Sequence, residues 1–287
     1  MPRRIQLLAM LALCLLAGRA GAKAEVAEQP DEARVVRNTA YYAKRIVQNA
    51  SVRVGLNVGA SAPFGIADNI SPLSYSPNFS PVIAFDREFV LWRGLTLSSG
   101  IRLEYKGMRT RAKVQYFKTS VRQEDDKGNI TQFDGHFTGE NITNINMAMA
   151  TLPLDIGWRF SPRYRLRLGG YISYLLYGSF TGAAQNGYTW TIPEEGATLR
   201  QRISITSASF DFSKELRKWD WGVEIASTHR VTDRFFVEAG LAVGVRSIFV
   251  EGFKGVSMDM HNMYGCLSLG YQLMPRREKA EKESSSN

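Results

Sequence analysis

The chain has 287 residues, enough for one or two domains. Its formal charge is +9, but four basic residues stand within the first 24 positions, and the remaining chain carries a modest +5. The lysines and arginines are scattered along the sequence, so no patch of the kind that binds nucleic acid is expected.

The first 24 residues have the layout of a secretory signal peptide. Arg3 and Arg4 make the start basic, residues 5–17 are apolar, and Ala22-Lys23-Ala24 fits a cleavage site. A transmembrane helix is the alternative, but about 13 apolar residues fall short of the roughly 20 that cross a bilayer. Cleavage would leave Cys266 as the only cysteine, so the predicted fold needs no disulfide.

Residues 25–50 differ from the rest of the chain, and we expect a periplasmic N-terminal segment there. Its apolar side chains recur at steps of three and four, with acids near its start and bases near its end, which is typical of a short amphipathic helix. An unstructured leader is the other interpretation. The polar residues 274–287 are expected to form a periplasmic tail.

From residue 51 the hydrophobic period changes to two. Residues 52–59 and 234–246 alternate between apolar and polar or small side chains, and Phe236 is the one large apolar residue on the polar row of the second segment. Six alternations in a row indicate a strand with one polar and one apolar face. Eight segments share this pattern: 52–59, 80–90, 95–106, 146–160, 164–179, 219–230, 234–246 and 262–273.

The connections between these segments alternate in length. Three are tight turns, and the other four are long: 61–79, 107–145, 180–218 and 251–260. Short turns at one rim and long loops at the other are typical of outer-membrane barrels. The sequence therefore predicts an eight-stranded antiparallel barrel over residues 51–273. Strand-like pieces at 113–121 and 203–212 are expected to extend its walls above the membrane.

The charges favour one assignment of the two faces. A soluble barrel would be apolar inside, but here one row carries the charges and the other is nearly free of them. An eight-stranded barrel is filled by side chains, and mixed acids and arginines inside it can pair. We therefore expect these residues inside: Arg53, Asp86, Arg102, Glu104, Asp155, Arg159, Arg165, Arg167, Glu224, Glu238 and Arg246.

Aromatic residues support the same assignment. They fall near both ends of the apolar row, as in the girdles that mark the two interfaces of a membrane. One girdle is predicted near the short turns and the other near the long loops: Trp92, Trp158, Phe160, Tyr164 and Tyr271 in the first, and Tyr105, Tyr174, Trp219 and Trp221 in the second. Their position predicts a protein of the outer membrane.

Three short motifs resemble a known group. They are Gly55-Leu56-Asn57-Val58-Gly59, Leu152-Pro153-Leu154 and the stretch 169–176, in this order along residues 51–273. In these motifs the chain resembles the PorT-like outer-membrane β-barrel proteins of Bacteroidota-type bacteria. The resemblance implies an eight-stranded barrel, and one member type implies a link to type IX protein secretion.

No catalytic or metal-binding group is expected. His136, His229 and His261 fall at different heights of the predicted barrel, so they cannot share a metal. His261 with a loop serine is the only arrangement that would suit a lipid-modifying enzyme, and a solvated histidine is the alternative. Glu224 and Glu238 are expected to pair with Arg165, Arg167 and Arg234 rather than act as acid and base.

The expected function is therefore non-enzymatic. The outer loops or the periplasmic ends would bind a partner, for instance through the polar loop that holds Asn129, Gly135, Phe137 and Thr138. Expected partners are outer-membrane lipids, lipopolysaccharide and a protein of a secretion or envelope complex, without a cofactor or nucleic acid. A narrow porin-like channel and an outer-membrane lipid-modifying enzyme are the alternatives.

Overall fold

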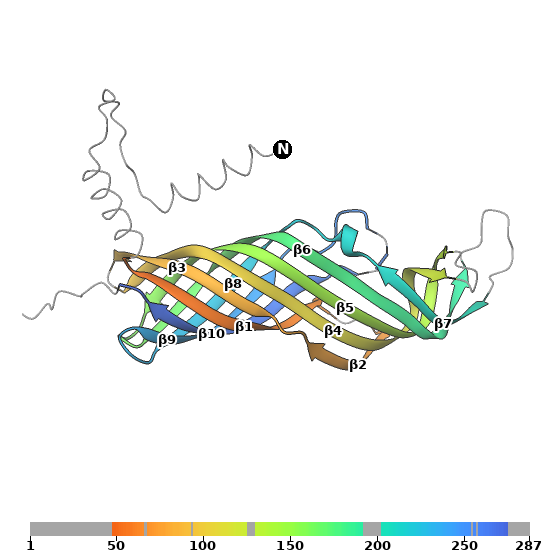
Figure 1. Ribbon diagram of the computed structural model, residues 1–287, viewed down its shortest axis with the longest axis horizontal. Helices are drawn as coiled ribbons and strands as arrows, with labels where there is room; N and C mark the ends of the chain where they lie inside the picture. The colour runs from red at the N-terminus through yellow and green to blue at the C-terminus, as the bar shows by residue number, and fades with distance from the viewer. Residues whose placement is uncertain are drawn as a thin grey trace, which may run out of the picture.

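The computed structural model describes residues 48–65, 68–92, 94–124, 130–191, 202–253, 255–256 and 258–274. The predicted signal peptide, most of the N-terminal segment and nearly all of the polar tail lie outside these residues. No helix among the described residues is long and apolar enough to cross a membrane. The chain forms instead one antiparallel sheet of ten strands (Figure 1).

In the described part of the chain, the strands follow one another with a single 3-10 turn, η1 (Ser213–Glu215), between the seventh and eighth. Their bounds are β1 Ala50–Ala62, β2 Ile70–Pro77, β3 Pro81–Trp92, β4 Leu95–Glu124, β5 Ile130–Arg159, β6 Tyr164–Thr191, β7 Arg202–Asp211, β8 Trp219–Arg230, β9 Phe235–Gly244 and β10 His261–Gln272.

The strand pairings close on themselves. The path runs β4-β3-β1-β10-β9-β8-β6-β5, and a long β4–β5 pairing joins its two ends. Strands β2 and β7 stand outside this ring: β2 pairs with β4, and β7 pairs with β6 and makes one bridge to β4. All pairings between strands are antiparallel, and the result is a tilted barrel that is longer than it is wide (Figure 1).

The tight turns gather at one end of the barrel. Strands β3 and β4 join through Gly94, whose φ of 75° suits a residue without a side chain. The links between β5 and β6 and between β8 and β9 lie at the same end, where the described chain also begins and ends. Asn49 donates its backbone N–H to the Met274 carbonyl oxygen at this end. We call this end the short-turn rim, because the tight turns lie there.

Three strands are far longer than a membrane requires. Strands β4 and β5 have 30 residues each and β6 has 28, whereas a transmembrane strand needs about 9–11. Their distal halves continue past the other strands with β7 beside them, and we call this projection the outer wall (Figure 1). Long links were expected at 107–145 and 180–218; the described parts of both are largely strand, because cross-strand pairing satisfies their backbone groups.

The expected strand-like pieces at 113–121 and 203–212 lie in β4 and β7, as predicted. The short strand β2 was not expected within the link 61–79, because its sequence contains two prolines and several serines rather than an alternating pattern. Strand β2 lies on an edge of the sheet, where proline is tolerated.

Candidate functional site

Paired charges fill the half of the barrel interior nearest the short-turn rim. Arg53 donates to Asp86 over 2.6 Å and also pairs with Glu238. Arg167 reaches the same Glu238 and lies 3.2 Å from Asp155. These five side chains come from five different strands and are all at least nine-tenths buried, so each ion is compensated by a partner from another part of the sheet.

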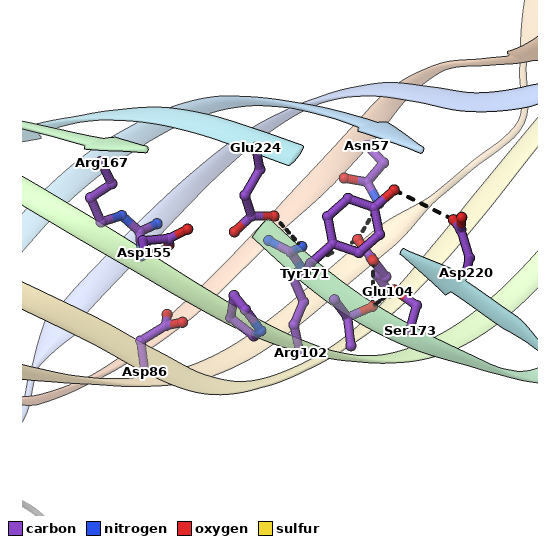
Figure 2. A network of polar contacts seen from close by, with 12 residues as sticks. Asn57, Asp86, Arg102, Glu104, Asp155, Arg167, Tyr171, Ser173, Asp220 and Glu224 are labelled. Carbon is purple, nitrogen blue, oxygen red and sulfur yellow. Dashed lines mark hydrogen bonds and ion pairs between the residues drawn. The ribbon is translucent and has the colours of Figure 1, made fainter. Parts of the chain in front are cut away.

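A second group of charges lies deeper in the barrel, around Arg102. Its guanidinium donates to Glu224 over 2.7 Å and lies 3.4 Å from Glu104, as Figure 2 shows. The Lys106 ammonium is 3.3 Å from Glu104, and Thr151 donates its hydroxyl to the same carboxylate. Glu104 therefore accepts from several donors, which offsets the cost of burying it.

Farther from the short-turn rim than Arg102, the interior changes from paired charges to a single carboxylate with neutral donors, and then to apolar side chains. Tyr171 donates its hydroxyl to Asp220 over 3.4 Å (Figure 2). Asn262 donates its amide to the same carboxylate over 2.9 Å. Beyond this layer the buried side chains are apolar. The cluster contains Met108, Ile145, Met147, Met149, Leu175, Phe180, Phe210, Phe212, Leu216, Ile248, Phe249 and Met260.

The link between β9 and β10 contributes to this apolar layer. The Phe249 ring lies 5.0 Å from that of Phe180, and Phe253 lies 5.0 Å from Phe212. Arg217 donates its side chain to the Phe249 carbonyl and its backbone N–H to Ile248. The link is therefore folded against the inner face of the sheet and covers the ionic layers.

Most of the interior charges were placed correctly from the sequence. Arg159 and Arg165 pair with Glu88 near the short-turn rim. The expected partners of two acids were partly wrong: Glu238 binds Arg167, but Arg234 is exposed and donates to Tyr271 instead. Arg246 lies just beyond β9 and faces the exposed Glu251, so it is not an interior residue.

Three interior charges were missed: Glu88, Lys106 and Asp220. Each has the same alternation parity as a residue that was placed inside, namely Asp86, Glu104 and Glu224. Extending each row by one or two pairs of residues would have found them. The alternating pattern predicts a strand that ends at Lys106, whereas β4 continues for many residues beyond it.

The three histidines lie apart, each against a different aromatic ring. His136 stacks on Tyr116, His229 lies against Tyr164 at the short-turn rim, and His261 stacks on Phe64. Among the described residues, no group of three or more histidine, cysteine or acidic side chains is arranged to hold a metal ion.

The outer wall has an apolar core of its own. Its members are Val114, Phe117, Phe137, Ala184, Ile205 and Ala208, with Val256 and Met258 packed against them. Phe137 was expected in a solvated loop, but it is almost completely buried in this core. Thr138 follows it in β5, whereas Asn129 lies outside the described residues. The outer wall therefore encloses packed apolar side chains of its own.

The outward face of the ring is apolar. Leu56, Leu154, Leu168 and Leu269 are each about half exposed or more, and Trp158, Phe160 and Tyr164 are exposed near the short-turn rim. Tyr174, Tyr177, Trp219 and Trp221 are exposed farther along the strands. An apolar band between two groups of aromatic residues defines an integral outer-membrane β-barrel.

Residues 43–250 match a protein family described as outer membrane protein beta-barrel domain. The chain belongs to this family, and its place is the outer membrane. The matched range covers the strands from β1 to β9. The family description does not specify the PorT-like group, so that finer resemblance stays a prediction.

A solved structure that matches this chain is that of Ail, the attachment invasion locus protein of Yersinia pestis, in complex with the heparin analogue sucrose octasulfate. The two chains are 11% identical with a TM-score of 0.32, and the likeness covers 77% of this chain and 96% of Ail. No curated protein sequence matches this chain.

Proposed function

We propose that the protein is a non-enzymatic binding component of the outer membrane that acts through its outer wall. The eight strands whose pairings close on themselves form the membrane-embedded ring, and β2 and β7 belong to the part outside it. The observation that carries this proposal is that β4 to β7 continue past the apolar band around a second apolar core. A rigid scaffold that projects from a membrane is suited to present a binding surface.

The filled interior supports a binding role over transport. Arg53, Arg102 and Lys106 are all at least nine-tenths buried by side chains from across the barrel. The apolar layer around Phe180 and Phe249 lies between these charges and the outer wall. Because ions need a continuous wet path, we expect very small single-channel conductance in planar bilayers. A conductance comparable to that of a general porin would contradict this role.

Photo-crosslinking in intact cells tests the binding role. A photoreactive residue at Gln115, which is exposed on the outer wall, should give a discrete adduct with a protein or glycan. The same residue at Leu168, which faces lipid, is the matched control and should give no such adduct. Absence of any adduct at Gln115 and at Ser207 in several growth states would overturn the proposal.

Mass spectrometry of lipid A tests the enzymatic alternative. If the protein does not modify lipids, deletion of its gene should leave the lipid A mass spectrum unchanged. A mass shift that the wild-type gene restores would instead show a lipid-modifying enzyme, with His261 the first residue to substitute.

A further inference from the structure

The outward face changes its chemistry sharply where the outer wall begins. On β4, Leu103 and Tyr105 are followed on the same face by Arg109. On β5, Leu152 gives way to Asn146 and Asn144. On β6, Tyr177 is followed by Ser179 and Thr181, whose cross-strand partners are Asn146 and Asn144. Three neighbouring strands therefore become polar at the same height, directly above the apolar band.

A cationic stripe lies on β4 at this height. Arg109, Arg111 and Lys113 alternate along the strand, so all three point outward, and all three are exposed. Alternate residues of a strand are about 7 Å apart. Their cross-strand neighbours on β5 are Asn144, Ile142 and Glu140, and on β2 they are serines. Among the described side chains, neither arginine has a carboxylate within ion-pair distance.

A shallow groove opens beside the stripe. Arg109, Asn144 and Gln185 line it together with Asn78. The Asn78 amide donates to Asn144 over 3.0 Å and to Asn146 over 2.8 Å, which holds these carboxamides in place. Arginine can bind a phosphate with two parallel hydrogen bonds, and carboxamides are suited to sugar hydroxyls because they both donate and accept.

The height of the stripe identifies the ligand. Arg109 lies four residues beyond Tyr105, about 13 Å along a tilted strand and about 10 Å along the membrane normal. That is the level of the headgroups rather than of the hydrocarbon. Because the protein lies in the outer membrane, the groups at this level on the outer-wall side belong to the outer leaflet.

We propose that Arg109, Arg111 and Lys113, with the groove beside them, bind the phosphorylated sugar headgroup of an outer-leaflet glycolipid of the lipid A type. The phosphates contact the three cations, and the sugar lies over Asn144 and Gln185. This inference rests on the placement of the barrel in the membrane and not on recognition of a partner by the outer wall, so the two proposals can fail separately.

Native mass spectrometry of the detergent-solubilised full chain tests the site. Bisphosphorylated lipid A is titrated against the wild type and against the triple variant Arg109→Gln, Arg111→Gln, Lys113→Gln. The matched control is the triple variant Arg163→Gln, Arg230→Gln, Arg234→Gln, which removes equal charge at the short-turn rim. Heat-modifiable migration on gels checks that each variant is folded.

We expect the outer triple variant to bind lipid A at least tenfold more weakly, and the short-turn variant to stay within about twofold of the wild type. Lipid A without phosphates should bind the wild type no better than it binds the outer variant. Equal affinity of the wild type and the folded outer variant would overturn the proposal, as would equal losses in both triple variants. Tighter binding of a soluble sulfated polysaccharide than of lipid A to the same stripe would also overturn it.

Discussion

Glu238 holds two arginine side chains at once inside the barrel. Arg53 reaches it from β1 and Arg167 from β6, and Thr228 donates its hydroxyl to the other carboxylate oxygen over 2.9 Å. Removing a buried acid costs more than the bond itself is worth, because its partners are left charged and unpaired. At the scale of single residues, the interior is therefore most sensitive at the charges with several partners.

The substitution Glu238→Ala should lower the free energy of unfolding by about 3–5 kcal/mol, the range for breaking a buried ion pair. Urea or guanidinium unfolding in detergent micelles, followed by gel migration, measures this change. Glu251→Ala is the matched control, because the Glu251 side chain is 87% exposed and its ion pairs lie in solvent. Similar unfolding midpoints for both variants would contradict the assigned role of Glu238.

A glycine beside Asp155 makes room for that carboxylate. A Cβ atom at Gly169 would lie 2.4 Å from the Asp155 Oδ1 atom and 2.2 Å from the Leu154 carbonyl oxygen. Gly169→Ala should therefore force the sheet to shift and lower the yield of folded barrel. Gly65→Ala, where a Cβ would meet nothing within 4 Å, should leave the yield unchanged. The folded fraction after refolding into detergent decides between them.

Strand β5 passes from the membrane into the outer wall along one outward face. Leu152, Leu154 and Ile156 face lipid, whereas Asn146 and Asn144 lie above the band. Substitutions along this strand therefore test where the membrane ends. A charged side chain lowers the stability of the barrel most at the midplane of the bilayer and little near its surface.

Leu154→Arg should destabilise the barrel in lipid vesicles by about 2–4 kcal/mol, the cost of an arginine near the bilayer midplane. Asn144→Arg should change stability by less than about 1 kcal/mol, as expected near an interface. Reversible urea unfolding in vesicles gives both values. A reversed order of the two effects would show that the apolar band had been placed wrongly on β5.

The whole molecule consists of two stacked cores with different chemistry. Paired charges stabilise the ring from inside, and apolar side chains fill the outer wall and the layer beneath it. The ionic layers lie inside the ring, and their ion pairs involve no residue from the distal parts of β4 to β7. The ring should therefore still fold when the outer wall is shortened.

Replacing residues 113–140 and 183–208 with tight turns removes the core around Phe117 and Phe137. We expect this variant to fold, to keep heat-modifiable migration and to lose the adducts of the outer wall in crosslinking experiments. A variant that inserts without any heat-modifiable form would show instead that the outer wall is needed for the ring to fold.

Several features of this protein are determined by its sequence alone. The period of two in residues 52–59 and 234–246 specifies which side chains share a face, because successive residues of a strand point to opposite sides. The same parity assigned Arg53, Arg102 and Glu238 to the interior correctly. The three tight turns and the predicted strand-like pieces at 113–121 and 203–212 were also found, because these signals lie within a few neighbouring residues.

Only the tertiary structure decided which charges meet and what closes the barrel. Arg53 and Glu238 are 185 residues apart, and their contact depends on the register of β1, β10 and β9, which no local pattern encodes. Arg234 and Arg246 have the right parity, but they lie beyond the ends of β9, where parity no longer places a side chain inside. The inward fold of the β9–β10 link likewise follows from its contacts with Phe180 and Phe212, because an apolar segment is buried only where distant strands leave an apolar surface to cover.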